Sequence, residues 1–199
     1  MASWSPHDRS NQMGKEIERR FRVKVARLCP NGEDGKPLPP GEYVKQAYFS
    51  RDPAIRIRMT GVSSTPASVW GQEAKAVLTI KSDATLERDE WNIPIASLRD
   101  AHDMMGLAKV GIIEKVRYKL RVPGQERPWE VDKFLGPHEG LWIAELELSA
   151  PDAEFAKPPW LGPEITQDKR YGNVALAADP TRFWEHPATS GVPADGSWP

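Results

Sequence analysis

The chain has 199 residues, which is enough for one sizeable domain, and its 27 basic and 28 acidic residues give a net charge of −1. This balance excludes a global attraction to nucleic acid or to anionic membranes as the basis of function. The single cysteine, Cys29, excludes an internal disulfide and fits a reducing cytosol.

Residues 1–13 are polar and lack periodicity, so we expect a disordered leader outside the fold. They contain neither a basic n-region nor an apolar h-region, and no later run approaches the about 18 apolar residues that a membrane span requires. We therefore expect a soluble, cytoplasmic protein with no nucleic-acid or membrane partner.

Eight segments have the composition of β-strands, and several of them alternate with period two. They are residues 16–25, 42–50, 54–60, 76–82, 86–95, 112–120, 128–135 and 141–149. A loop rich in proline and glycine, 28–42, separates the first two strands. Short turns link the later strands, which favours antiparallel neighbours.

Two helices interrupt this pattern. Residues 96–110 place apolar side chains at helical spacing, and residues 151–156 follow Ser149 with a proline early in the segment. We expect both helices to pack outside the sheet. Residues 179–199 are rich in proline and glycine and predict a loosely held tail, so the domain should span residues 14–178.

Charged side chains share one face of most predicted strands, because residues two apart on a strand point to the same side. Arg56 and Arg58 alternate with apolar residues, and so do Glu145 and Glu147. For a single strand, a solvated outer face is the simpler interpretation. The whole set, however, is almost purely Arg, Lys, Glu and Asp, often in same-sign pairs that repel unless an oppositely charged ligand lies between them.

We therefore predict a mainly β, α+β fold: an eight-stranded antiparallel closed barrel with helices outside and the charges inside. The carboxylates could hold a hard cation such as Mg²⁺ or Mn²⁺, which prefers oxygen ligands. The Arg and Lys side chains could bind phosphate oxygens. The pattern thus predicts an enclosed site for a metal–polyphosphate complex.

Several motifs resemble those of the CYTH superfamily, the triphosphate tunnel metalloenzymes. The stretch EIERRF resembles the family's ExExK signature, and it is followed in the family's order by RIR at 56–58, LTIK at 78–81, EKVRY at 114–118, VDKF at 131–134 and ELEL at 145–148. Residues 158–177 resemble the ending of the small bacterial inorganic triphosphatase-like members. The resemblance implies an eight-stranded tunnel in which basic residues bind a triphosphate and acidic residues bind a divalent cation.

The same resemblance implies roles for individual residues. The residues expected on the metal side are Glu16, Glu18, Asp132, Glu145 and Glu147. The residues expected to bind phosphate are Arg56, Arg58, Lys81, Arg88, Lys115, Arg117 and Arg170. The candidates for a catalytic role are Arg20, Tyr48 and Lys81.

Two positions differ from the family pattern. Arg20 stands where the signature lysine is usual, a residue thought to position or activate the attacking water in the family. Arginine stays protonated and cannot act as a base, although it can orient phosphate or water. Asn92 stands where many members have a second acid after Glu90.

The leading interpretation is divalent-metal-dependent hydrolysis of a triphosphate, with inorganic tripolyphosphate as the expected substrate. The sequence leaves open an adenylate cyclase of the CYTH type, a thiamine or nucleoside triphosphatase, and a non-catalytic polyphosphate-binding module. It also leaves a homodimer open. No Walker-type glycine loop or GxGxxG motif is present, so side chains rather than a helix N-terminus would bind the phosphates.

Overall fold

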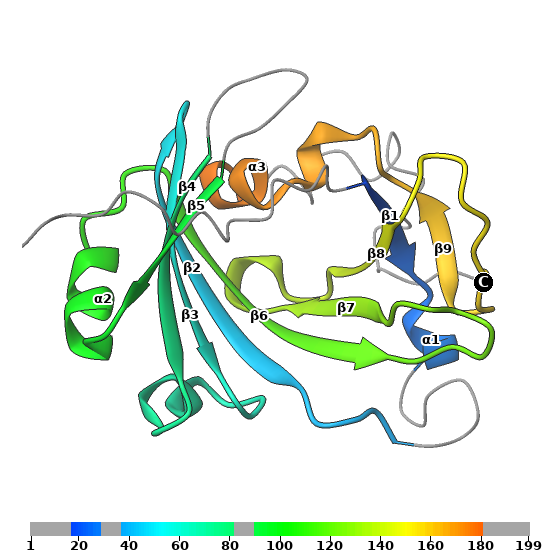
Figure 1. Cartoon of the computed structure of the whole chain (residues 1–199), viewed down its shortest axis with the longest axis horizontal. Helices are drawn as coiled ribbons and strands as arrows, with labels where there is room; N and C mark the ends of the chain where they lie inside the picture. Colours follow the sequence, from blue (N-terminus) through cyan, green and yellow to red (C-terminus); the bar gives the residue numbers. More distant parts are fainter. Residues whose placement is uncertain (1–16, 29–36, 82–89, 181–199) are drawn as a thin grey trace, which may run out of the picture.

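The computed structural model describes residues 17–28, 37–81 and 90–180, and their arrangement is drawn in Figure 1. The strands are β1 (Ile17–Val23), β2 (Glu42–Arg51), β3 (Ala54–Gly61), β4 (Lys75–Lys81), β5 (Glu90–Ile95), β6 (Gly111–Leu120), β7 (Trp129–Phe134), β8 (Trp142–Leu148) and β9 (Leu161–Glu164). The helices are α1 (Val25–Leu28), α2 (Leu98–Met105) and α3 (Asn173–Ala178), with 3₁₀ turns η1 (Pro66–Trp70), η2 (Gly136–His138) and η3 (Lys169–Tyr171). The expected leader, 1–13, and all but the first two residues of the expected tail lie outside the described residues.

All of these strands belong to one sheet with the order β5-β4-β3-β2-β6-β7-β8-β1-β9. Every neighbouring pair in it is antiparallel. Each of the eight predicted strand segments coincides with a strand to within a few residues. The expectation of a mainly β, antiparallel fold is therefore confirmed.

The expected closed eight-stranded barrel is wrong, because the sheet is open and has a ninth strand. Closure would require β5 to pair with β1, but β1 already pairs with β8 along one edge and with β9 along the other. The backbone N–H of Ile165 extends the second contact by donating to the carbonyl of Arg20 at 2.8 Å. With both edges of β1 occupied, the sheet ends at β5 on one side and at β9 on the other.

Strand β9 has a sequence that disfavours an interior strand, since Pro163 lacks an N–H and is tolerated mainly at sheet edges. Gly162 permits a close approach to β1, because a Cβ at this position would lie 3.0 Å from the carbonyl oxygen of Arg22. The segment LGPE therefore becomes a strand only because β1 offers it a free edge.

The sheet curves so that β3, β4 and β5 face β1, β8 and β9 across its concave side (Figure 1). Helix α3 lies between these two arms and packs on β2 and β6. Its Leu176 and Ala177 join a buried apolar cluster with Ile113 and Phe134. This cluster fills one end of the concave side and leaves the space beside it to polar residues.

The convex face of the sheet carries the two other apolar clusters. Helix α2 buries Ala101 and Met105 against β3, and the segment before β9 buries Trp160 against Trp129, with ring centroids 5.6 Å apart. Because apolar and charged residues alternate along the strands, burial of one face turns the charged side chains to the concave side.

The helix predicted over 96–110 is confirmed in a shorter form as α2. The hydroxyl of Ser97 caps it by accepting a hydrogen bond from the backbone N–H of Asp100 at 3.1 Å. No helix in the described part of the chain is long and apolar enough to cross a lipid bilayer.

The helix predicted over 151–156 is wrong, since this segment is a turn followed by irregular backbone. Phe155 packs against Phe21 and Trp129 with ring centroids 5.9 Å apart in both cases. The backbone N–H of Ala156 donates to Gln125 Oε1 at 3.1 Å instead of to a helical carbonyl. A six-residue segment gains little from helix formation, so these tertiary contacts decide its conformation.

Candidate active site

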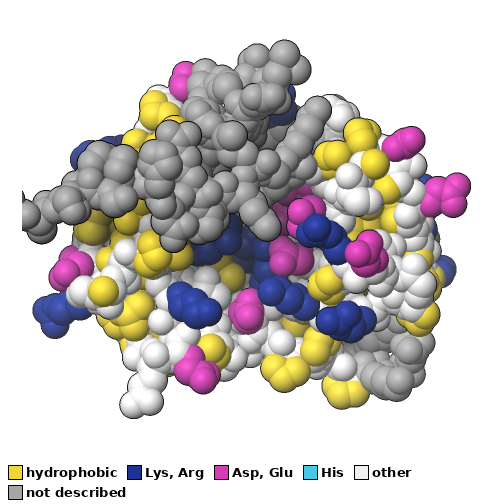
Figure 2. Space-filling model, viewed as in Figure 1, with side chains coloured by type: hydrophobic (Ala, Val, Ile, Leu, Met, Phe, Trp, Pro, Cys, Tyr) yellow, Lys and Arg dark blue, Asp and Glu magenta, His cyan; other side chains and the backbone are white. Residues whose placement is uncertain are grey.

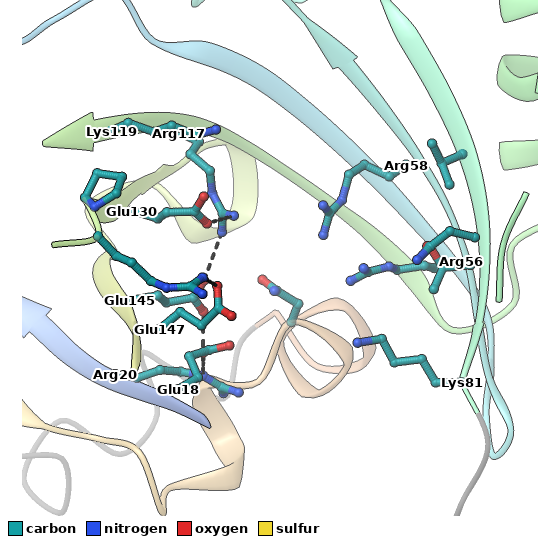
Figure 3. Close-up of a pocket in the computed structure, with 16 residues that line it drawn as sticks. Glu18, Arg20, Arg56, Arg58, Lys81, Arg117, Lys119, Glu130, Glu145 and Glu147 are labelled. Carbon is teal, nitrogen blue, oxygen red and sulfur yellow. Dashed lines mark hydrogen bonds and ion pairs between the residues drawn. The ribbon is translucent and has the colours of Figure 1, made fainter. Parts of the chain in front are cut away.

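A cavity of about 680 Å³ lies on the concave side of the sheet and is lined mainly by charged and amide side chains (Figure 3). In the space-filling view, Lys, Arg, Asp and Glu side chains gather around a hollow in the middle of this face (Figure 2). The lining residues are Glu18, Arg20, Arg56, Arg58, Val77, Thr79, Lys81, Asn92, Arg117, Lys119, Arg127, Pro128, Glu130, Glu145, Glu147 and Asn173.

Four glutamates from three adjacent strands line one side of this cavity, and we call them the acidic wall. Glu18 of β1 lies opposite Glu147 of β8, and Glu145 of β8 lies opposite Glu130 of β7. Residues directly opposite each other in antiparallel strands point to the same face. Register therefore places carboxylate beside carboxylate, an arrangement that repels unless cations separate them.

Three cations on the opposite arm of the sheet form what we call the basic wall: Arg56 and Arg58 of β3 and Lys81 of β4. All three point across the cavity toward the acidic wall (Figure 3). Arg58 Nε donates to Gln46 Oε1 at 3.0 Å, and the buried Nε of Arg56 has no hydrogen-bond partner in the described part of the chain. This wall therefore offers hydrogen-bond donors for an anion.

Burial and the neighbouring positive charges both act on the Arg58 guanidinium. Burial, followed by the nearby charges of Arg56 and Arg117, lowers the pKa of Arg58 to about 10. The Arg58 guanidinium is nevertheless protonated at neutral pH, because this pKa is still well above 7. An anion bound between these side chains would relieve the repulsion that lowers the pKa.

Arg20 belongs to the acidic side of the cavity. Its Nε donates to Glu18 Oε1 at 2.5 Å and lies 3.6 Å from Glu145 Oε1. Burial is the largest cause that raises the pKa of Glu145, to about 7. A cation close to Glu145 therefore favours its ionised form.

Two further arginines contact the acidic wall. Arg117 donates to Glu130 and, through Nη2, to Glu145 Oε2 at 2.9 Å. Arg127 donates to Glu147 Oε2 at 2.5 Å. With Arg20 on Glu18, every carboxylate of the acidic wall thus contacts a guanidinium.

Asp132 lies beneath this lining, fully buried between two cations. Lys115 Nζ donates to its Oδ2 at 2.5 Å, and Arg117 donates to both of its oxygens. Burial alone would raise the pKa of Asp132, but the charges of Lys115 and Arg117 outweigh it and lower the pKa to about 2. Neither Asp132 nor Lys115 lines the larger cavity, although Lys115 lines a smaller one of about 120 Å³ that shares Arg58 and Arg117 with it.

The structure gathers eight of the predicted site residues around the cavity: Glu18, Arg20, Arg56, Arg58, Lys81, Arg117, Glu145 and Glu147. Two other predicted residues do not line the cavity. Tyr48 is buried in the apolar cluster beneath α3, although it interacts electrostatically with Arg20 and Arg58. The guanidinium of Arg170 is held by Asp168 at 2.5 Å. Glu16 and Arg88 lie outside the described residues.

Eight residues line the cavity although the sequence does not assign them to the site: Val77, Thr79, Asn92, Lys119, Arg127, Pro128, Glu130 and Asn173. Lys119 is two residues after the predicted Arg117, and Glu130 is two before the predicted Asp132. Strand alternation therefore places both on the same face as the predicted residues. Arg127 lies in a turn and Asn173 begins α3, and strand alternation carries no signal for either.

Residues 14–175 match the family described as the CYTH domain. This chain belongs to the CYTH family. The CYTH chain is 37% identical over 174 residues to an inorganic triphosphatase of Acetivibrio thermocellus, a match that covers 84% of this chain and 96% of that protein. It is 34% identical over 166 residues to an inorganic triphosphatase of Nitrosomonas europaea, covering 81% and 96% of the two chains. A crystal structure of an inorganic triphosphatase is also similar, with a TM-score of 0.59 and 31% identity, covering 83% of this chain and 96% of the other.

Membership of the CYTH family implies a divalent metal ion. The chemistry of the acidic wall fits such an ion, because carboxylate oxygens are the ligands that hard cations prefer. Among the described residues, no three acidic, histidine or cysteine side chains form a ready-made metal cluster. The residues therefore fit a cation that is held by one or two carboxylates, waters and substrate phosphates, as is usual for Mg²⁺.

Proposed function

We propose that this CYTH protein is a cytoplasmic enzyme that hydrolyses inorganic tripolyphosphate with the help of Mg²⁺ or Mn²⁺. The observation that carries the proposal is the pair of facing walls around one cavity (Figure 3). A phosphate chain with a bound cation needs both walls. Its oxygens need cationic hydrogen-bond donors, and its cation needs carboxylate ligands. Similarity to the inorganic triphosphatases of A. thermocellus and N. europaea supports the choice of substrate.

The basic wall is proposed to bind the phosphate chain. Arg56 and Arg58 can donate charge-assisted hydrogen bonds to non-bridging oxygens, and Gln46 fixes the guanidinium of Arg58. Lys81 lines the same cavity and adds a point charge. Such positioning and charge neutralisation supply most of the catalysis in phosphoryl transfer.

The acidic wall is proposed to hold the divalent cation through one or two of the carboxylates of Glu18, Glu145 and Glu147, with waters and substrate phosphates as the other ligands. Glu16 remains a predicted ligand that lies outside the described residues. The cation, when bound, supplies Lewis-acid polarisation of a phosphoryl oxygen and orientation of water. For Asp132 we propose a different role from the predicted one. It holds Arg117 in place, because its oxygens already accept from Arg117 and Lys115.

Water attack on the terminal phosphorus atom breaks its bond to the bridging oxygen and releases orthophosphate and pyrophosphate. Arg20 cannot be the base for this step, because a guanidinium stays protonated. We propose that Lys81 and Arg20 orient the terminal phosphoryl group and the water. Tyr48, Arg88, Lys115 and Arg170 remain sequence-based predictions.

The test is release of orthophosphate by the purified full chain. Tripolyphosphate, ATP and thiamine triphosphate are compared, each with Mg²⁺, with Mn²⁺ and with a chelator. We expect release from tripolyphosphate in the presence of either cation and none in the chelator. No phosphate release from any of the three compounds contradicts the proposal, and tight tripolyphosphate binding without turnover favours the binding-module alternative.

A further inference from the structure

Arg20 is a basic residue placed among acids. It lies on β1 two residues after Glu18, and it is directly opposite Glu145 of β8. Its Nε donates to Glu18 at 2.5 Å and lies 3.6 Å from Glu145. The guanidinium thus lies at the meeting point of two carboxylates that are proposed to hold the divalent cation.

The two other arginines on the acidic wall are held differently. Arg117 is anchored from behind by Asp132, which accepts two hydrogen bonds from it. Arg127 lies near the outside, and the side chains of Arg127 and Glu147 are 50% and 48% exposed. Arg117 is therefore fixed whether or not a ligand is bound, while Arg127 contacts a carboxylate that water also reaches.

In the part of the chain that the structure describes, no acidic side chain outside the wall forms an ion pair with Arg20. Among the described residues, its side-chain ion-pair partners are Glu18 and Glu145 alone. Its side chain is 29% exposed and lines the cavity, so it can turn away from the wall without leaving a buried charge unpaired.

We propose that Arg20 is the resident counter-cation of Glu18 and Glu145, and that a divalent cation must displace it in order to bind. The guanidinium and the metal ion need the same carboxylate lone pairs, and two cations within a few ångströms of each other repel. Displacement of Arg20 therefore sets the affinity of the protein for its metal. This inference rests on the proposed cation site, but it concerns the protein without substrate.

The first test is calorimetric titration of Mn²⁺ into the substrate-free full chain. We expect Arg20→Ala to bind Mn²⁺ about tenfold more tightly than the wild type, because a charge-assisted bond no longer has to be broken. The matched control is Arg19→Ala. Arg19 is the preceding residue on β1 and donates two bonds of 2.6 Å to Glu164, so its removal changes the net charge equally but leaves the acidic wall intact. We expect its Mn²⁺ affinity to equal that of the wild type.

A second measurement uses the unmodified chain, so it does not depend on the folding of a variant. In an NMR titration with Mg²⁺, the Nε–Hε resonance of Arg20 should move with the midpoint of metal binding, while that of Arg19 stays in place. The proposal is overturned if Arg20→Ala binds Mn²⁺ no more tightly than the wild type, if Arg19→Ala tightens binding equally, or if saturating Mg²⁺ leaves the Arg20 resonance unmoved. If these tests fail but the protein releases phosphate from tripolyphosphate, the proposal about Arg20 is wrong and the proposed function still holds.

Discussion

Arg117 and Asp132 form a bidentate ion pair, in which Nε donates to Oδ1 at 2.7 Å and Nη2 donates to Oδ2 at 2.6 Å. Lys115 donates to the same carboxylate at 2.5 Å, and Asp132 is 0% exposed. The aspartate therefore neutralises two cations from within the sheet. Arg117 also contacts Glu130 and Glu145, which line the cavity. Asp132 therefore holds Arg117 in place against the acidic wall.

Replacement of this carboxylate should destabilise the protein. We expect Asp132→Asn to lower the free energy of unfolding by about 3 kcal/mol, because two buried cations lose their counter-charge. Urea denaturation followed by circular dichroism measures the change. The matched control is Glu130→Gln, which removes a 34% exposed partner of the same arginine and should cost about 1 kcal/mol or less. Equal losses in the two variants would count against the structural role of Asp132.

The same residue gives a pH dependence of stability. The pKa of Asp132 is lowered from 3.8 to about 2, so the folded state favours the ionised form. Its stabilising contribution is present above about pH 4 and is lost as the pH falls through about 2. We therefore expect the difference in unfolding free energy between the wild type and Asp132→Asn to shrink as the pH is lowered from about 5 to about 2. A difference that stays constant over this range contradicts the assignment.

A third prediction concerns the basic wall. Arg58→Ala should weaken the binding of tripolyphosphate about tenfold to a hundredfold, since it removes charge-assisted hydrogen bonds. Calorimetry in the presence of a chelator measures binding without turnover. Arg99→Ala is the control, because Arg99 lies on α2 with its side chain 87% exposed and does not line the cavity. Unchanged affinity in Arg58→Ala would place the phosphate chain elsewhere.

Most strands could be predicted from the sequence because the alternation of apolar and charged residues is a local property. Strand β9 could not, since Gly162 and Pro163 disfavour a strand on local grounds. It forms because β1 has a second edge to offer, which is a property of the assembled sheet. The error about barrel closure follows from the same cause, because β9 occupies the edge that closure requires.

The sequence predicts a site residue where it is enough to know on which face of the sheet the side chain lies. The positions of Arg58 and Glu145 on the concave face follow from the alternation along their strands alone. Asp132 lies on the same face, but it is buried under Arg117. Alternation along a strand does not predict how deeply a side chain is buried. Asn173 reaches the cavity from α3, whose position depends on packing against β2 and β6. The face of each strand is thus local information, while depth and helix placement are not.

The fourth prediction concerns the metal. Glu147→Gln should raise the Mn²⁺ concentration needed for half-maximal phosphate release about tenfold, because it removes a carboxylate ligand. Its affinity for tripolyphosphate in the presence of a chelator should stay the same, since the basic wall is intact. Glu164→Gln on β9 is the control, because Glu164 pairs with Arg19 and does not line the cavity. An unchanged Mn²⁺ requirement in Glu147→Gln would remove this residue from the metal site.

The last prediction concerns the choice between phosphate compounds. No aromatic side chain is among the described residues that line the cavity, so these residues offer a nucleobase no aromatic ring on which to stack. Stacking of a base on an aromatic ring contributes about 1–3 kcal/mol, and ATP would bind here without it. We therefore expect kcat/KM for tripolyphosphate to exceed that for ATP about tenfold or more at equal Mn²⁺, measured as orthophosphate release. A preference for ATP, or the formation of cyclic AMP from it, would instead favour a cyclase that uses the same two walls to bind its triphosphate.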